Sequence, residues 1–228
     1  MTDHCSESIR PDLPRIGSPK ALRLSEIRSL APDCILSDQN ENRPEEIREL
    51  QKEFRVLSFD VRSVPAVLDA VSALGRLADK ISQAQKLVSE IKTEYETSRA
   101  HCEGNPPLET LLLLWNQPYL TINFDTYASR LIECCGGRNV FHEEPLREFP
   151  ADLEDLIEKN PSLLLLPGDP FPFARRHIKG FRQYRVFSQI PIKLIDGHLI
   201  SRFGPKTAEA LRTFRNLFDE MRKDPAPA

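Results

Sequence analysis

Residues 31–43 read APDCILSDQNENR, a short apolar run that follows a proline and then breaks into a polar loop. Apolar residues at helical spacing over 22–30 precede this stretch, and Pro32 ends that helix. Residues 34–36 predict a buried strand, because a short apolar run bounded by loop residues is typical of one. The loop 38–43 therefore places amides, carboxylates and a guanidinium at the end of a strand, which raises the question of what they bind.

Strands and helices continue to alternate after this loop. Pro44 opens a helix whose first turn carries Glu45 and Glu46, where the helix dipole favours acidic side chains. Residues 56–59 (VLSF) predict the next strand, and Ser63 is the expected N-cap of the helix that follows. This alternation predicts an α/β fold in which parallel sheets are covered by helices.

The same order of elements recurs in the second half of the chain. Residues 153–157 predict a helix, 163–166 (LLLL) a strand, and 167–173 (PGDPFPF) a loop. Arg185–Ser188 (RVFS) is comparable to RVLS at 55–58 and predicts a further strand. We therefore predict two structurally similar lobes, each Rossmann-like.

One long helix is expected between the lobes. Residues 75–100 contain no proline and no internal glycine, and apolar residues recur every three or four positions. At 1.5 Å per residue the helix would be about 39 Å long, and the stripe lacks the sustained heptads of a coiled coil. We predict a partial N-terminal lobe at 1–74, a connecting backbone helix at 75–103 and a C-terminal lobe at 104–228.

Composition and charge exclude several classes of partner. A net charge of −3 gives no global field that attracts nucleic acid or an anionic membrane. No segment approaches the roughly 20 apolar residues of a membrane span, and the N-terminal stretch lacks the pattern of an export signal. The five cysteines are odd in number and include no C-x-x-C, so we expect mostly free, partly buried thiols.

The loops at the strand ends contain the candidate site residues, because ligands of open parallel sheets bind beyond the carboxyl ends of the strands. The aromatic candidates are Trp115, Tyr119, Phe124, Phe171 and Phe173. Aromatic side chains in a cleft suit a large, flat or apolar ligand, although core packing explains any single one equally well. The hydrogen-bonding candidates are Asn40, Glu41, Asn42, Arg43, Asn116 and Arg202.

The sequence gives little support for a catalytic site or a metal site. The chain has no G-x-S-x-G, no P-loop and no G-x-G-x-x-G, and nothing raises an acid–base pairing of Asp125 with Asp169 above background. The segment 142–144 (HEE) contains metal-ligand residue types without zinc spacing and is better explained as a solvated loop. We predict neither catalysis nor a resident cofactor or metal.

A basic run follows the loop 167–173. Its members are Arg175, Arg176, His177, Lys179, Arg182 and Arg185. A solvated helix face explains it better than a phosphate or nucleic-acid site, because no aromatic stacking pattern accompanies it and the overall charge is negative. Arg175 is near enough to the loop to contact a carboxylate of a ligand.

These segments resemble one protein family. The chain is similar to the helical-backbone (class III) substrate-binding proteins of ABC importers, which include receptors for cobalamin, haem, siderophores and some metals. The matching segments are LAPDCILSDQNENR, LDAVSALGRL with the long helix after it, LLWNQPYLTINFDTYASRLIECCGGRNVF, NPSLLLLPGDPFPF and DGHLISRFGPKTAEAL. The run from Asp125 to Phe141 is the most specific, and the cobalamin-receptor type is the closest resemblance.

The resemblance implies a non-catalytic receptor that holds a cobalamin-like corrinoid or another metal chelate in the cleft between its lobes. It also implies an ABC permease with its ATPase as partners, a monomeric state, and a periplasmic or extracytoplasmic location. Without a signal peptide, the chain as written is expected in the cytoplasm. The alternative is a non-transport interaction or orphan binding protein derived from this fold.

The same resemblance implies roles for individual residues. TDHC at 2–5 corresponds to a cleft loop of the family, which adds Asp3 and Cys5 to the site and implies a truncated first lobe or a start further upstream. Arg202 and Phe203 belong to the DGHLISRFGP segment, in which Leu199 replaces an expected tryptophan and Ser201 lies near an expected acid. Glu45 or Glu46 is the expected permease contact.

Overall fold

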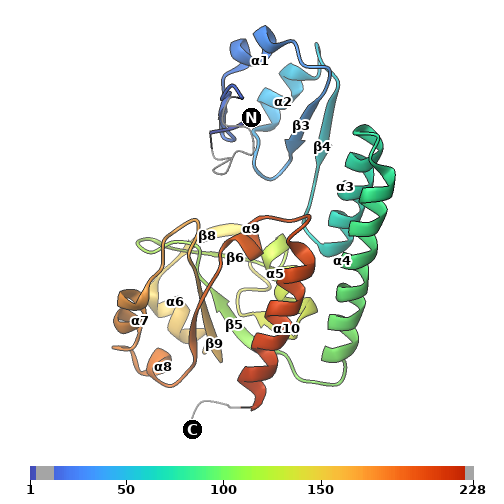
Figure 1. Cartoon of the computed structure of the whole chain (residues 1–228). Coiled ribbons are helices and arrows are strands. Elements are labelled where there is room, and N and C mark those ends of the chain that lie inside the picture. The colour runs from blue at the N-terminus through green and yellow to red at the C-terminus, as the bar shows by residue number, and fades with distance from the viewer. Residues whose placement is uncertain (4–12, 224–228) are drawn as a thin grey trace. The chain divides into compact units, whose positions relative to one another are not determined.

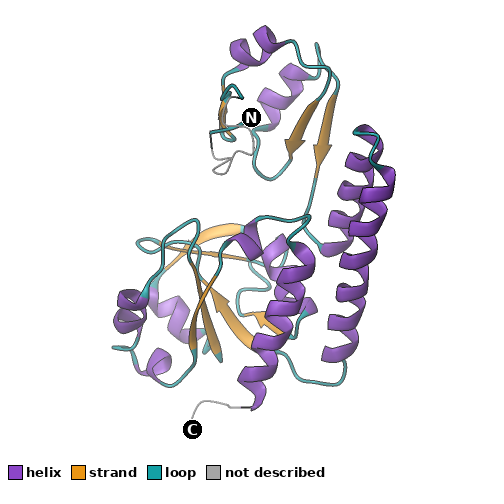
Figure 2. Ribbon diagram, in the orientation of Figure 1, coloured by secondary structure: helices purple, strands orange, loops and turns teal. Residues whose placement is uncertain are grey.

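The structure is a computed structural model that describes residues 1–3 and 13–223. It divides into two compact units, Met1–Val61 and Arg62–Ala228 (Figure 1). The division falls between Val61 and Arg62, whereas the sequence placed its lobe boundaries after residues 74 and 103. The predicted mixture of helices and parallel strands is confirmed in both units (Figure 2).

The first unit contains a parallel pair of strands covered by two helices. Its elements in order are β1 (Gly17–Ser18), β2 (Ala21–Leu22), α1 (Leu24–Leu30), β3 (Ile35–Asp38), α2 (Pro44–Leu50) and β4 (Val56–Phe59). β1 pairs antiparallel with β2, and β3 pairs parallel with β4. The core is small: Ile27, Ile47 and Leu50 are buried, and Ile35 and Val56 pack against them from the strands. Leu36 lies on the opposite face of β3 and is 53% exposed.

The second unit is built on a parallel sheet with the strand order β10-β9-β5-β7. These strands are β5 (Leu108–Leu112), β7 (Gly137–Asn139), β9 (Leu163–Pro167) and β10 (Ile192–Ile195). All five residues of β9 are buried, because a central strand of a parallel sheet is covered on both faces. A separate antiparallel pair is formed by β6 (Tyr119–Ile122) and β8 (Glu148–Ala151).

Helices complete the second unit. They are α3 (Val64–Leu77), α4 (Ile81–Cys102), α5 (Tyr127–Cys134), α6 (Leu153–Glu158), α7 (Arg175–Phe181), α8 (Arg185–Ser188), α9 (His198–Ser201) and α10 (Thr207–Lys223). α4 and α10 lie side by side (Figure 1). Glu94 of α4 joins them by accepting hydrogen bonds from Arg212 and Arg215 of α10. No helix in the described ranges is long and apolar enough to cross a bilayer.

The long helix expected at 75–103 is present as α4, but it begins at Ile81, because the residues up to Leu77 belong to a separate helix, α3. α3 ends at Leu77, Asp79 adopts a left-handed φ of 52°, and α4 begins at Ile81. Gly75 permits the contact between the two helices: a Cβ placed there would lie 2.2 Å from the Cβ of Ala84. Both helices belong to the second unit, and the role of α4 as a connector between lobes stays a prediction.

The strand expected at Arg185–Ser188 is also wrong, because these residues form α8 and the strand follows at β10. The side chain of Arg182 holds the turn compact by donating from Nη1 to the carbonyls of Phe187, Ser188 and Ile190, each at 2.8 Å. Phe187 is fully buried. RVFS at 185–188 and RVLS at 55–58 are therefore similar in sequence but differ in structure, because the first is helical and the second lies largely in a strand.

Cysteines 34, 102, 134 and 135 are free thiols, as the sequence predicted for most of its cysteines, and Cys5 lies outside the described residues. Burial raises the pKa of Cys134 to about 11 and also raises the pKa of Cys135. These thiols are therefore protonated at neutral pH.

Candidate ligand-binding site

The candidate site in the second unit is formed by loops after three neighbouring strands. β5, β9 and β10 run parallel and adjacent in the sheet. Their carboxyl ends therefore lie at the same edge, where the segments 113–118, 168–174 and 196–203 follow. This edge is where the sequence placed its ligand.

Trp115 sits in a tight turn between β5 and β6. Leu114 N donates to Leu120 O at 2.8 Å, and Leu120 N donates to Trp115 O at 3.3 Å. Gln117 has a φ of 69° and is joined to Pro118 by a cis peptide bond. The indole is 39% exposed, so Trp115 does not fill the core.

Trp115 is the outermost member of an aromatic cluster that also contains Phe171, Phe173 and His177. The ring centroids of Trp115 and Phe171 are 5.3 Å apart with an interplanar angle of 65°, and those of Phe171 and Phe173 are 4.7 Å apart. Phe171 is half-buried, whereas Phe173 is only 6% exposed and belongs to the core. The expectation that Phe173 faces a ligand is therefore corrected: its ring supports Phe171 from below.

The loop that carries Phe171 is anchored on the segment after β10. Gly168 N donates to Ile195 O at 3.0 Å. Gly197 lies so close that an added Cβ would be 2.2 Å from the carbonyl oxygen of Asp169. This contact requires glycine at 197 and fixes the start of the loop relative to the sheet.

His177 also belongs to this aromatic cluster. The sequence predicted instead that it lies on a solvated basic helix face. Its ring centroid lies 5.2 Å from that of Phe171 and 5.4 Å from that of Phe173. Nδ1 accepts a hydrogen bond from Ala174 N at 2.9 Å. Burial, followed by the nearby charge of Arg176, lowers the pKa of His177. The sequence contained one signal for this placement, since His177 follows shortly after the aromatic loop 167–173.

Tyr119 is the first residue of β6 and packs against the core of the second unit. Its ring centroid is 5.6 Å from that of Phe181, and burial raises the pKa of its phenol. Asn116 lies in the turn between Trp115 and Tyr119. The structure thus brings Trp115 and Phe171 together at one surface and places Tyr119 at the strand that follows.

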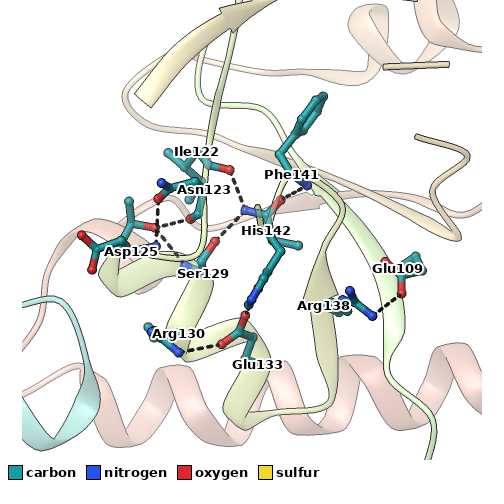
Figure 3. A network of polar contacts seen from close by, with 12 residues as sticks. Glu109, Ile122, Asn123, Asp125, Ser129, Arg130, Glu133, Arg138, Phe141 and His142 are labelled. Carbon is teal, nitrogen blue, oxygen red and sulfur yellow. Dashed lines mark hydrogen bonds and ion pairs between the residues drawn. The ribbon is translucent and has the colours of Figure 1, made fainter. Parts of the chain in front are cut away.

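Phe124 packs on a different set of groups. The guanidinium of Arg130 lies 4.6 Å from its ring centroid, and the His142 ring lies 5.0 Å away. Glu133 contacts both of these partners, at 3.4 Å from Arg130 and 2.9 Å from His142 (Figure 3). His142 therefore packs against Phe124 and contacts Glu133 through Nδ1.

The motif from Asp125 to Phe141 carries structural contacts. Asn139 Nδ2 donates to Ile122 O and to Ser129 Oγ, both at 2.6 Å, and its Oδ1 accepts from Phe141 N (Figure 3). The most specific part of the resemblance therefore marks how α5 is held against β6 and β7.

Asp125 and Phe203 also have partners of their own. Burial alone would raise the pKa of Asp125, but hydrogen bonds from Arg147 (2.9 Å) and Arg62 (2.7 Å) outweigh it and hold this pKa below its usual value. Phe203 packs edge-on against Tyr127 at 5.9 Å. Arg202 caps α9 at its C-terminal end, and Leu199 is buried.

The polar loop 38–43 of the first unit is largely occupied by its own hydrogen bonds. Asn42 Oδ1 accepts from Asp38 N at 3.0 Å, and its Nδ2 donates to Pro19 O at 3.1 Å. Asn40 N donates to Asp38 Oδ1 at 2.8 Å. The side chains of Asp38 and Asn42 therefore build the turn that ends β3, and the side chain of Asn40 donates from Nδ2 to Asp60 Oδ1 at 3.3 Å.

A hollow of about 350 Å³ lies beside this loop within the first unit. Its lining includes Ser37, Gln39, Asn42, Arg48 and Ser58. Glu41 and Arg43 are exposed in the loop. This hollow has a polar wall and an apolar floor formed in part by Ile47 of the unit's core.

The remaining expected residues lie near the start of the chain and of α2. Asp3 pairs with Arg23 at 3.4 Å, whereas Cys5 lies outside the described residues. Glu46 accepts a hydrogen bond from Leu22 N at 3.3 Å, and Glu45 is exposed. Over residues 1–3 and 13–223, no group of three or more His, Cys, Asp or Glu side chains is arranged to hold a metal ion.

Known proteins are similar to this chain in sequence and in fold. The family model described as periplasmic binding protein matches residues 1–191. A vitamin B12-binding protein of Vibrio cholerae is 21% identical over 154 residues, which cover 67% of this chain and 56% of that protein. The match therefore spans little more than half of the relative's length.

Two solved structures share the fold. The periplasmic vitamin B12 binding protein BtuF of Vibrio cholerae superimposes with a TM-score of 0.80 at 18% identity, covering 92% of this chain and 83% of that one. The periplasmic heme-binding protein BhuT, in complex with two hemes, gives a TM-score of 0.76 at 21% identity, with the same two coverages. The fold expected from the sequence is thus confirmed.

Proposed function

Because the chain belongs to the periplasmic binding protein family, we propose that it is the solute-receptor component of an ABC importer and holds a cobalamin-like corrinoid or another metal chelate. One observation carries the proposal: Trp115 presents an exposed indole against a half-buried Phe171 at the carboxyl ends of parallel strands. The relatives named as binding vitamin B12 or heme support a broad ring-shaped ligand.

Binding rests on packing against an apolar ring system, without any chemical step. The indole and the Phe171 ring offer a rigid apolar surface, and two χ angles per side chain keep the entropy cost of ordering low. Phe173 and His177 fix Phe171 from behind. Because Gly197 anchors the loop, the surface is formed before the ligand arrives.

The proposal includes a permease with its ATPase as partners and an extracytoplasmic location. Glu45 is the better candidate for the permease contact, because its carboxylate is exposed in the first turn of α2 whereas Glu46 already binds Leu22 N. The alternative expected from the sequence, a cytoplasmic interaction protein, receives no support from the matched family and relatives.

Titration of the purified chain with cyanocobalamin, haemin and a ferric siderophore tests the proposal. Trp115 is the only tryptophan of the chain, so fluorescence quenching reports on this site alone, with visible absorbance as the second readout. We expect at least one chelate to bind with a Kd below roughly 100 µM, which corresponds to about 5.5 kcal/mol. Absence of binding by all three at that concentration contradicts the proposal.

A further inference from the structure

The segment between Asp169 and Asp196 is strongly basic within a chain of negative net charge. Residues 170–195 contain six lysine and arginine residues and no aspartate or glutamate, whereas the whole chain has 31 basic and 34 acidic residues. A local concentration of one sign of charge attracts and orients a partner even where the net charge does not. The net charge of −3 therefore conceals a positive region of the surface.

This region is formed by α7 and α8, which are held together at one side of the second unit (Figure 1). The rings of Phe181 and Phe187 join the two helices, with their centroids 5.3 Å apart. Four exposed cations lie on these helices: Arg175, Arg176 and Lys179 on α7, and Arg185 at the start of α8. We call these four residues the basic face. Its three members on α7 are spaced by three and four residues and so share one side of that helix.

The positive charge of the basic face is not compensated from within the chain. Over the described ranges 1–3 and 13–223, no carboxylate lies within ion-pair distance of any of its four members. Arg176 donates from Nε to His177 Nε2 at 3.3 Å, but the acceptor there is an imidazole and not an anion. By contrast, Lys193 of the same acid-free segment pairs with Glu220 at 2.8 Å. The basic face is therefore available to an external anion.

An exposed aromatic side chain accompanies these charges. Tyr184 directly precedes Arg185 and is 36% exposed. Tyrosine combines an apolar ring with a polar tip and is enriched where proteins meet the headgroup region of a bilayer. Guanidinium groups bind phosphate oxygens through two parallel hydrogen bonds. Arginine and lysine around an exposed aromatic ring are typical of a surface that lies on a membrane.

We propose that the basic face docks on the surface of an anionic bilayer, with its cations on lipid phosphates and Tyr184 at the level of the headgroups. A plane of phosphates satisfies all four cations at once, although they lie on two different helices. The choice of a bilayer over an acidic protein rests on the proposed function, because the receptor of an importer works beside the membrane that holds its permease. The sequence had explained this basic run as a solvated helix face.

Two double variants test the basic face with the same change of net charge. Lys179→Gln with Arg185→Gln removes one cation from each helix and leaves Trp115 and Phe171 untouched. Arg76→Gln with Lys86→Gln is the matched control, because both residues are exposed on helices of the same unit, outside the basic face. Unfolding in urea checks that both variants are folded.

Binding is measured by co-sedimentation with vesicles of phosphatidylcholine alone and of equal parts phosphatidylcholine and phosphatidylglycerol. The wild-type chain is expected to bind only the anionic vesicles. Each lysine or arginine near an anionic membrane contributes roughly fivefold, so the basic-face variant should bind about 25-fold more weakly and the control variant like the wild-type chain. Raising the salt concentration should weaken the binding, since salt screens exposed charges.

Three results would overturn the inference: no binding to the anionic vesicles, equal binding to both kinds of vesicle, or equal losses in the two double variants. Binding of soluble polyglutamate by a chain that ignores the vesicles would assign the basic face to an acidic protein instead. Chelate affinity should be the same in the basic-face variant and the wild-type chain. If no chelate binds but the anionic vesicles bind as expected, the proposed function fails and the membrane-docking face remains.

Discussion

Trp115 combines rigidity with exposure, which is uncommon for a side chain of its size. The turn between β5 and β6 fixes its backbone by two hydrogen bonds, and Phe171 supports one edge of the indole. A side chain that is ordered in advance loses little entropy when a ligand covers it. The binding energy of the site is therefore expected to concentrate here.

Trp115→Ala should weaken binding of a chelate by at least about 1 kcal/mol, because aromatic anchors carry a large share of binding energy. The measurement is a visible-absorbance titration, since the variant has no tryptophan to observe. Leu146→Ala removes another exposed apolar side chain, 62% exposed, and should leave affinity unchanged. Equal affinities for the wild-type chain and Trp115→Ala would show that the indole does not touch the ligand.

His177 should make the stability of the chain depend on pH below neutrality. Its folded-state pKa is lowered, first by burial and then by Arg176, so the unfolded chain binds a proton more readily. The stabilisation is complete above the unfolded pKa of roughly 6.5 and is lost as pH falls through the folded-state pKa. Urea unfolding from pH 7 to pH 5 should show a steeper loss for the wild-type chain than for His177→Asn; parallel curves would contradict this.

At the level of residues, the sequence pointed to side chains whose residue type and position at a strand end suggest a role. Trp115 and Phe171 were recognised as strand-end aromatics, and they are in contact. His177 was missed because the charges around it dominate the local pattern, while its ring contacts depend on how the loop folds. Asn42 was expected to contact a ligand, but its side chain closes the turn.

The helical hairpin of α3 and α4 depends on a close approach at Gly75. Gly75→Ala should destabilise the chain by about 1–3 kcal/mol, because the new methyl group overlaps the Cβ of Ala84 and forces the helices apart. The change is measured as the free energy of unfolding in urea. The double variant with Ala84→Gly removes the overlap and should recover part of the loss.

Gly180→Ala provides the matched comparison for Gly75→Ala. Gly180 also lies in a helix, but an added Cβ there meets no atom within 4 Å. Helix propensity alone then applies, and the variant should be neutral or more stable by up to about 1 kcal/mol. Equal effects at the two glycines would show that the contact with Ala84 is unimportant.

At the level of elements, the sequence predicted existence and type better than boundaries. The strand at Val56–Phe59 and the N-cap at Ser63 were placed correctly. The turn between α3 and α4 was missed because it contains neither proline nor glycine, and Asp79 adopts the left-handed conformation that aspartate tolerates. α8 was mistaken for a strand because the hydrogen bonds of Arg182 that fold it are not visible in four residues.

For the whole molecule, the recurring order of elements was the strongest prediction. α1, β3, α2 and β4 in the first unit are matched by α6, β9, α7, α8 and β10 in the second, and both strand pairs are parallel. The division between the units was not predictable, because both helices of the hairpin belong to the second unit. Charge and composition contain no signal for that choice.

The two units should differ in their resistance to local opening. Within the described part of the first unit the core cluster is small, formed by Ile27, Ile47 and Leu50, and Leu36 is exposed, whereas the second unit has a larger core around fully buried leucines of β9. Amides of β3 and β4 should therefore exchange hydrogen faster than those of β5 and β9. Hydrogen exchange followed by mass spectrometry measures this, and equal protection in both sheets would indicate that the chain opens as one cooperative body.

The leucines of β9 have a further consequence during synthesis. Before the sheet forms, LLLLP at Leu163–Pro167 is an uncharged apolar segment of the kind that pairs between chains and drives aggregation. Pro161 and Pro167 border it, and proline lacks the N–H that an intermolecular strand needs. The two prolines therefore act as gatekeepers, limiting misassembly to four residues until neighbouring strands bury them.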